Sequence, residues 1–382
     1  MKKFKVFLLS VLVFLFTFGL CFADFPNSAD RIEGTVAFGY YEIWHATPSV
    51  DGYWARWNDT GHNPEINDIM SMYWPLGGLY SNGNYNIYST HAYGIKRAHL
   101  DAVIIGWGNA YQGEFERLKT AVIGFHDNGL KSIVAIYPKW SGEEWDSLIN
   151  RLDTLISYIT NYPNYFFHSN GKPVIMIGHP DRDDLIYNPD QGDLYTSWKH
   201  KIHYYKTNKD LFPNGVIFIA ADCQLDWLKD SYWDGWFWSG VPSDEDGVDH
   251  LNYNIWKLYT IDDYNRFYIQ TIIAGFDTRA NCHDFNPIVR DRENGELFKR
   301  IWGWVKQAQW NGYKIDHCSV PINDHGECAN IYPADPNPPM RGNGYQSCGG
   351  RVPQYYFTYE PLDPWWYIDE NARQVDEFKA TR

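Results

Sequence analysis

The chain has 382 residues and a formal net charge of −14 at pH 7. A protein this negative repels nucleic acid and anionic membranes, so we expect neither as a partner. Aromatic residues make up 18% of the chain, with 18 Trp and 29 Tyr. Many of these rings pack in the core, but clusters such as Trp236-Phe237-Trp238 are harder to hide there, and accessible rings are suited to stacking on sugar faces.

The N-terminus has the three-part layout of a secretory signal peptide. Three lysines within the first five residues precede an apolar run, and Cys21-Phe22-Ala23 follows. We expect cleavage after Ala23, so that residues 1–23 are the signal peptide and the mature protein, residues 24–382, is secreted to the extracellular space or the periplasm. The alternative is a retained N-terminal anchor. No later run approaches the roughly 20 apolar residues of a spanning helix, so we expect no membrane partner after cleavage.

The mature chain has an odd number of cysteines, so at least one thiol should stay outside any disulfide in an oxidising compartment. The sequence leaves the pairing open. Neither a CxxC nor a CxxxH arrangement occurs, and we expect no metal site and no cofactor. The five cysteines are Cys223, Cys282, Cys318, Cys328 and Cys348.

Eight short, apolar and β-branched runs alternate with segments of helical character. Most of the runs are continuously apolar, which is typical of parallel strands buried on both faces. Strand and helix repeated eight times predict a (β/α)8 TIM barrel, of class α/β, that occupies residues 24–382 as a single domain. The alternative is an open doubly wound sheet, but Gly106-Trp107-Gly108 does not match its GxGxxG phosphate loop. The expected strands are Val36–Glu42, Ala102–Trp107, Ser132–Tyr137, Pro173–His179, Val216–Asp222, Gly235–Ser239, Tyr268–Phe276 and Cys318–Asp324.

Helical spacing of apolar residues, together with terminal glycines and asparagines, predicts helices over Glu114–Asn128, Glu143–Thr160 and Glu296–Trp310. The segment 333–350 is rich in Pro, Gly and Asn, and we expect a long loop there after the last strand. A terminal helix is expected over Pro364–Lys379.

Active sites of such barrels lie at the C-terminal ends of the strands, where this chain collects polar and aromatic residues. Each has a structural alternative: Asp222 could cap a helix, His179 could be a satisfied buried histidine, and the large rings could pack in the core. Glu42 could orient a substrate or pair with an arginine such as Arg56. The expected substrate-binding residues are Tyr41, Trp107, Tyr137, His179, Asp222, Trp238, Asp277 and Asn323.

The segment Asn323-Asp324-His325-Gly326-Glu327 follows the eighth expected strand and places two carboxylates three residues apart. Cleavage of a glycosidic bond needs one protonated acid at the leaving oxygen and one ionised carboxylate on the nucleophile side. Neighbouring carboxylates push each other's pKa values apart, which suits this division of roles. Taken alone, the same residues are also ordinary turn chemistry.

This motif resembles the Asn-Asp-aromatic-Gly-Glu motif of glycoside hydrolase family 71, the α-1,3-glucanases. At the same spacing it resembles the Asn-Glu-Trp-His-Glu motif of family 99, the endo-α-mannosidases. Similarity to family 99 extends, in order, over most of residues 36–333. The matching segments are Phe38-Gly39-Tyr40-Tyr41, Asp51-Gly52-Tyr53-Trp54, Trp57-Asn58, Pro75-Leu76-Gly77-Gly78-Leu79-Tyr80-Ser81, Asp101–Trp107, Asn170–Ile175, Gly275-Phe276-Asp277 and Arg292-Glu293-Asn294-Gly295.

The resemblance implies a barrel enzyme that cleaves an α-linked polysaccharide or glycan internally, with carbohydrate as its partner and without a cofactor. It implies Asp324 as the base or nucleophile-side carboxylate and Glu327 as the general acid. Because the first carboxylate is Asp, and His325-Gly326 replace the Trp-His of family 99, sugar and linkage are not carried over. We expect a monomer.

The resemblance implies two mechanisms, since the family 99 pattern is retaining and the family 71 pattern inverting. Asp is one methylene shorter than Glu and leaves more room for a water, so we favour inversion. Two other functions remain as alternatives: a carbohydrate-binding barrel without catalysis, and an enzyme that processes envelope polysaccharide. The predicted export and the lack of a phosphate-binding loop favour degradation over synthesis.

Overall fold

The computed structural model describes residues 30–108, 110–139, 142–182, 185–186, 193–228, 232–238, 265–282, 287–324, 328–358 and 363–381. The expected signal peptide, 1–23, lies outside the described residues. So do Glu327 and its two preceding neighbours, His325 and Gly326. Within the described part of the chain, none of the helices has the length and apolar character needed to cross a membrane.

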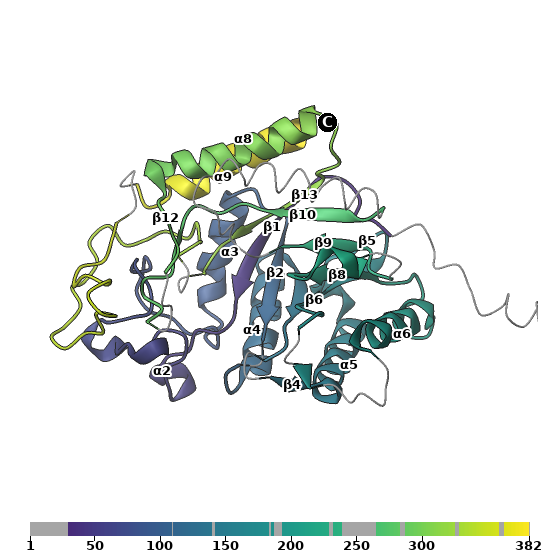
Figure 1. Ribbon diagram of the computed structural model, residues 1–382, viewed down its shortest axis with the longest axis horizontal. Helices are drawn as coiled ribbons and strands as arrows, with labels where there is room; N and C mark the ends of the chain where they lie inside the picture. Colours follow the sequence, from purple (N-terminus) through teal and green to yellow (C-terminus); the bar gives the residue numbers. More distant parts are fainter. Residues whose placement is uncertain are drawn as a thin grey trace, which may run out of the picture.

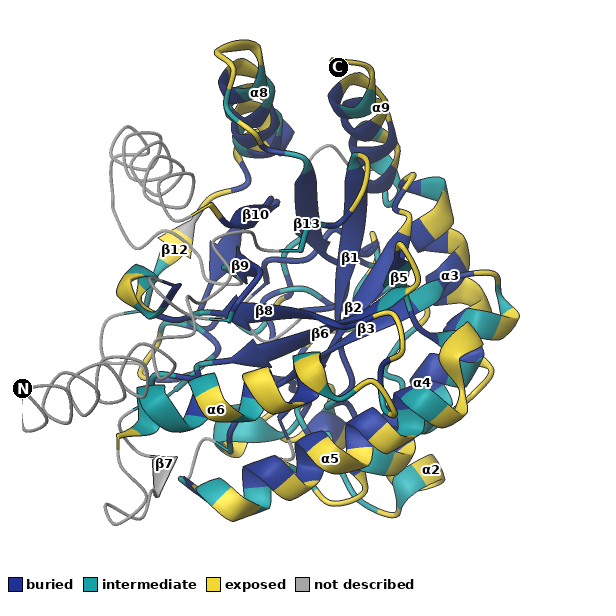
Figure 2. Ribbon diagram, turned by 90° about the vertical axis from the view of Figure 1, so that its right-hand side faces the viewer, coloured by how far each residue is buried: buried dark blue, intermediate teal, exposed yellow. Residues whose placement is uncertain are grey.

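Eight parallel strands close into a barrel, as predicted. The first strand, β1, is hydrogen-bonded to the second and also to the last, with Val36 opposite His317 and Tyr40 opposite Pro321. The pairing of the third and fourth barrel strands completes the ring, which Figure 2 shows as buried strands enclosed by helices. The barrel strands are β1 (Val36–Glu42), β2 (Ala102–Trp107), β3 (Lys131–Ile136), β6 (Lys172–Gly178), β8 (Ile217–Ala221), β9 (Gly235–Phe237), β10 (Phe267–Thr271) and β13 (His317–Pro321).

The strand limits agree with the expected ones at β1 and β2 and shift by one to three residues at the other strands except the seventh. The seventh strand, β10, is much shorter than expected because the chain leaves the barrel wall after Thr271. It then forms a separate antiparallel pair, β11 (Phe276–Asp277) with β12 (Val289–Arg290). The last strand, β13, ends at Pro321, so Asn323 and Asp324 lie beyond it. Ser239, at the end of the expected sixth strand, lies outside the described residues.

Helices surround the barrel and turn their exposed faces outward (Figure 2). Helix α8 has the predicted limits, and α4 ends one residue early. Helix α5 begins two residues late because Glu143–Glu144 form the short strand β4, which pairs with β7 (Leu185–Ile186). Helices α8 and α9 lie against each other along one side (Figure 1). The helices are α2 (Pro48–Asp51), α3 (Ile87–Arg97), α4 (Glu114–Asp127), α5 (Trp145–Asn161), α6 (Leu194–Thr207), α8 (Glu296–Trp310) and α9 (Trp366–Ala380).

Both faces of the barrel strands are buried, but they belong to two different hydrophobic clusters. In β1, Phe38 and Tyr40 belong to the cluster inside the barrel, whereas Ala37 and Tyr41 belong to the cluster between barrel and helices. Both clusters are closely packed because successive strand side chains point to opposite faces. This parity decides which strand-end residues can reach the barrel mouth.

Two long segments meet over the C-terminal mouth, at the left of Figure 1. One joins β1 to α3, and the other follows β13. Bridges join Tyr73 to Phe357 and Pro75 to Ala334, and the fully buried ion pair of Arg341 and Asp68 ties the segments together. Residues 333–350 form a long loop, as predicted.

A disulfide joins Cys282, in the loop between β11 and β12, to Cys348 in the C-terminal segment. Three buried cysteines lie outside it, which agrees with the expectation that at least one thiol remains. They are Cys223, Cys318 and Cys328.

Candidate active site

Asp324 lies at the mouth of the barrel, just beyond β13, and is only 7% exposed. Arg56 Nη2 is 3.8 Å from Asp324 Oδ1 and 3.7 Å from Oε2 of Glu42, the last residue of β1. Arg56 also lies over the ring of Trp44, with its guanidinium carbon 5.1 Å from the ring centroid. Two buried carboxylates thus share one guanidinium, which stabilises their charged forms where little water reaches them. Of the two roles considered for Glu42, the structure supports pairing with Arg56.

Asn323 is fully buried and connects the ends of β13 and β1. Its Oδ1 accepts a hydrogen bond from Glu42 N at 2.7 Å, and its Nδ2 donates to Glu42 O at 2.8 Å and to the Tyr80 hydroxyl at 3.2 Å. The prediction that Asn323 binds substrate is therefore wrong, because these bonds occupy its amide and no surface is left for a ligand. Asn323 instead joins the segment that carries Asp324 to the end of β1.

Two tyrosines lie across the interior of the barrel beneath this mouth. Tyr40 and Tyr137 belong to the interior cluster, and the Tyr137 hydroxyl donates to Asp222 Oδ2 at 3.2 Å. Burial raises the pKa of Tyr40 well above its usual value, so its hydroxyl stays protonated. Glycines make room for both rings, since a Cβ at Gly106 would lie 2.7 Å from the Tyr40 hydroxyl and one at Gly178 would lie 2.1 Å from the Tyr137 ring.

His179 and Asp222, at the ends of neighbouring strands β6 and β8, both have left-handed backbones, with φ of 44° and 54°. His179 Nδ1 lies 2.8 Å from Asp222 O, and the His179 ring contacts that of Tyr137 edge-on. Non-glycine residues rarely adopt this conformation, and such strain is concentrated at functional sites. The structure therefore brings three of the expected residues, Tyr137, His179 and Asp222, into one group.

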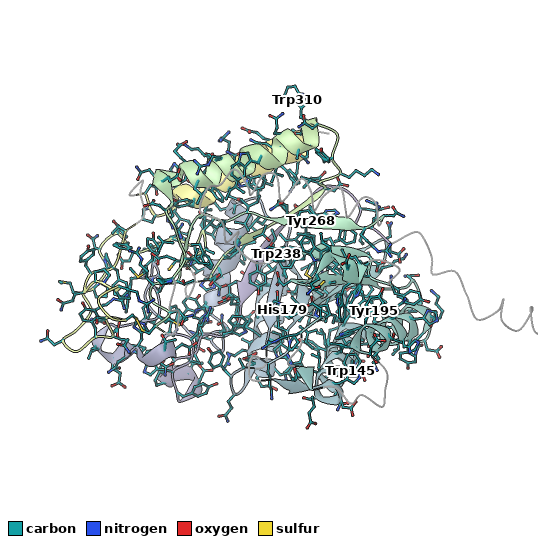
Figure 3. The ribbon with its side chains drawn as sticks, in the orientation of Figure 1. Trp145, His179, Tyr195, Trp238, Tyr268 and Trp310 are labelled. Carbon is teal, nitrogen blue, oxygen red and sulfur yellow. A yellow bond between two sulfur atoms is a disulfide. The ribbon has the colours of Figure 1, made fainter. Side chains whose placement is uncertain are left out.

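Trp238 follows β9, is half-buried, and packs against Trp236 with ring centroids 5.4 Å apart. Figure 3 labels Trp238 and His179 near the centre of the view. Its role as a stacking surface remains a prediction.

Two expected substrate-binding residues face the wrong way. Tyr41 is fully buried between barrel and helices, where its hydroxyl lies 2.5 Å from His91 Nδ1 and accepts from Asn82. Trp107 is 3% exposed and is covered by Arg151, whose guanidinium carbon lies 4.6 Å from the ring centroid. Both side chains are core residues because they occupy the outward positions of β1 and β2.

Asp277 is buried on β11, outside the ring of barrel strands. Its carboxylate is bound by the Arg279 side chain through Nε and Nη2 and by the Arg279 backbone N. It lines a separate cavity and does not belong to the group of residues around Tyr137.

One group of possible metal ligands occurs among the described residues, formed by His62, Cys282 and Cys348. Its two sulfurs are joined in the disulfide and are not thiolates. Both ring nitrogens of His62 already lie 2.8 Å from protein oxygens, of Asp68 and Ala280. The arrangement stabilises the segments over the mouth and does not offer a metal site.

A (β/α)8 barrel with carboxylates buried at its C-terminal mouth is thus the class that fold and site define. The sequence matches no family model. The chain is similar to a structure of the family 99 endo-α-mannosidase from Bacteroides thetaiotaomicron, with a TM-score of 0.70 and 19% identity over 91% of this chain and 98% of that one. The complex of this mannosidase with bis-tris-propane gives a TM-score of 0.67 and 18% identity, over 90% of this chain and 97% of that one.

A glycoside hydrolase-like protein also aligns, with a TM-score of 0.56 and 12% identity over 92% of this chain and 98% of that one. At such identities the likeness is one of fold, and it agrees with the family 99-like barrel expected from the sequence segments.

Proposed function

We propose that this protein is a secreted glycoside hydrolase that cleaves an α-linked polysaccharide or glycan within the chain. Asp324 acts as the base or nucleophile-side carboxylate, and Glu327 acts as the general acid. The observation that carries the proposal is the burial of Asp324 at the C-terminal mouth, beside Arg56 and within a group of polar strand-end residues. The active sites of such barrels lie at the C-terminal ends of the strands, so a carboxylate buried there is a candidate for catalysis.

The surroundings of Asp324 suit an ionised carboxylate. Arg56 supplies the compensating charge. Asn323, the residue before Asp324, is held by its hydrogen bonds to Glu42 at the end of β1, so Asp324 has little freedom to turn away. Glu327, three residues later, lies outside the described residues, and its role rests on the sequence motif. Chemical balance requires that the acid protonate the leaving oxygen while Asp324 removes a proton from the attacking group.

Inversion is the mechanism we propose, with Asp324 deprotonating a water. The first product would then carry the anomeric configuration opposite to that of the bond cleaved. Proton NMR of the reaction mixture within the first minutes distinguishes the outcomes, because mutarotation is slower. An initial product with unchanged configuration would instead show a retaining mechanism.

Reducing-sugar release by the purified mature protein tests the function. The panel contains α-mannan, α-1,3-glucan and related α-glucans, and Glu327→Gln is the inactive variant. Glu33→Gln is the matched control, since Glu33 is exposed and precedes β1 at the opposite end of the barrel. We expect release by wild type and Glu33→Gln and a loss of about 100- to 10,000-fold in Glu327→Gln.

Activity that persists in Glu327→Gln would refute the assignment of the acid. Absence of release from every polymer, combined with binding to one of them, would favour a carbohydrate-binding barrel. Circular dichroism of both variants distinguishes a loss of activity from a loss of fold.

A further inference from the structure

A cavity of about 750 Å³ lies beside the barrel mouth. Its walls come from five separate parts of the chain, among them Tyr73, β11 with Arg279, β12 with the turn 291–294, and the C-terminal residues Phe357 and Thr358. Cys328, four residues after Asp324, also lines it. In Figure 1 this region is found around β12. The cavity therefore adjoins the segment that carries the proposed catalytic pair.

The cavity walls are held in place by charged groups within them. The Arg292 guanidinium donates to the carbonyls of Cys328 and Asn330, both at 2.9 Å, and lies 4.9 Å from the ring centroids of Tyr73 and Tyr367. Arg292 thus ties the cavity wall to the segment that follows Glu327. A binding site needs such preorganised walls, because ordering them on binding would reduce affinity.

Polar groups with spare hydrogen-bonding capacity surround the cavity. Arg279 uses Nε and Nη2 on Asp277, and Asp291 uses Oδ1 on Glu293 N. Among the described residues, Arg279 Nη1, Asp291 Oδ2, the Asn294 amide and the Thr358 hydroxyl make no hydrogen bond. Donors and acceptors are therefore both present around one space.

The turn that carries two of these groups has an unusual backbone. Glu293 and Asn294 have left-handed φ values of 49° and 52°, and Gly295 follows at 87°. Gly295 is held against α9, since a Cβ there would lie 2.2 Å from the Trp366 ring. Strain of this kind occurs where a turn must present side chains to a ligand.

The chemistry of the lining favours a neutral sugar. The Phe357 ring, over which Arg279 lies at 5.1 Å, and the 42% exposed Val289 supply apolar surface beside the spare donors and acceptors. The lining has three acidic residues and two arginines; Arg279 pairs with Asp277, and Glu293 pairs with Arg300 outside the cavity. A sugar ring presents the same mixture of apolar face and hydroxyl edge, whereas an anionic ligand would find no excess of positive charge.

We propose that this cavity binds a neutral sugar unit of the substrate at a distance from the bond that is cleaved. The inference rests on the proposed function and deepens it, because it makes the substrate an oligosaccharide or polymer long enough to reach from Asp324 to the β11–β12 pair. Short substrates are then bound by the barrel mouth alone.

The test compares substrates of different length. Oligosaccharides of two to eight units prepared from α-mannan and α-1,3-glucan are assayed with wild type, Phe357→Ala and Asn294→Gly. Glycine keeps the left-handed backbone at 294 and removes only the side chain. Trp310→Ala is the control, since Trp310 is 83% exposed on α8 and does not line the cavity.

We expect the ratio of kcat/KM for the longest to the shortest cleaved substrate to fall at least tenfold in Phe357→Ala and severalfold in Asn294→Gly, through KM rather than kcat. Trp310→Ala should keep the wild-type ratio. Hydrolysis with a ratio unchanged in both cavity variants would overturn the inference while leaving the proposed function intact.

Binding of the same oligosaccharides to Glu327→Gln by isothermal titration calorimetry separates the other outcomes. Binding that is weakened by a second substitution, Phe357→Ala, would support the cavity site even if no substrate is cleaved. Binding to neither protein and hydrolysis of no substrate would overturn both proposals. Asn294→Gly keeps the test decisive if Phe357→Ala fails to fold.

Discussion

Replacing Gly178 with alanine should destabilise the protein through a single contact. Gly178 is the last residue of β6, and an added Cβ would lie 2.1 Å and 2.2 Å from two carbon atoms of the Tyr137 ring. The ring cannot easily give way, because Tyr137 is 7% exposed inside the barrel and its hydroxyl is bonded to Asp222. Overpacking of this kind costs about 1–3 kcal/mol. We expect a loss near the upper end, with Tm lower by about 5 °C.

Urea unfolding and calorimetry of Gly178→Ala measure this loss, and Gly303→Ala is the matched control. Gly303 lies in α8 with no atom within 4 Å of an added Cβ, so alanine there should raise the stability by about 1 kcal/mol. In a Tyr137→Ala background the same Gly178→Ala change should become neutral or stabilising, because it fills part of the space left by the ring. Equal destabilisation in both backgrounds would refute the contact as the cause.

Three further outcomes follow from buried polar groups. Asn323→Asp keeps the acceptor for Glu42 N but loses the donor to Glu42 O and buries a charge, so urea unfolding should show a loss of about 3 kcal/mol. Wild-type stability would show that the hydrogen bonds between Asn323 and Glu42 do not stabilise the fold. Burial lowers the pKa of His91 and of His317 to about 3, so the unfolded chain binds more protons between pH 3 and 6.5. The free energy of unfolding should therefore fall as pH drops below 6.5, by about 1.4 kcal/mol per pH unit for each histidine, and His91→Gln should show a shallower slope. Burial raises the pKa values of the three thiols outside the disulfide, Cys223, Cys318 and Cys328. Iodoacetamide should therefore modify none of them in the native mature protein. Mass spectrometry should count three modified cysteines after unfolding and five after unfolding and reduction.

The fold could be predicted because barrel strands are apolar on both faces and leave continuous runs in the sequence. The rule that active sites lie at the strand ends selected Tyr137, His179 and Asp222, which the structure brings together. It could not choose between adjacent residues, and Tyr41 and Trp107 are each one position away from the inward-facing Tyr40 and Gly106. Taking every second residue of β1 from the inward-facing Phe38 gives Tyr40 and Glu42 as the residues that point toward the barrel interior and its mouth.

Residues supplied by irregular segments left a weaker signal. Arg56 was considered only as a partner for Glu42, and Tyr80 only as part of a family-like segment, although both contact the site. The loop between β1 and α3 has no periodic pattern, so its path over the mouth depends on contacts with the C-terminal segment, such as the bridge between Tyr73 and Phe357. Contacts across such a sequence distance are not encoded in either segment alone.

Closure of the barrel by β1 and β13 has a consequence for synthesis. Val36 of β1 pairs with His317 of β13. At about 5–20 residues per second, the ribosome synthesises His317 about 15–55 s after Val36, so one edge of β1 has no partner strand during that time. During that interval β1 and the newest strand are both open edges, which are surfaces for pairing with other chains. The nascent chain is therefore most prone to aggregation just before its eighth strand is made, and slower translation upstream of His317 would prolong that exposure.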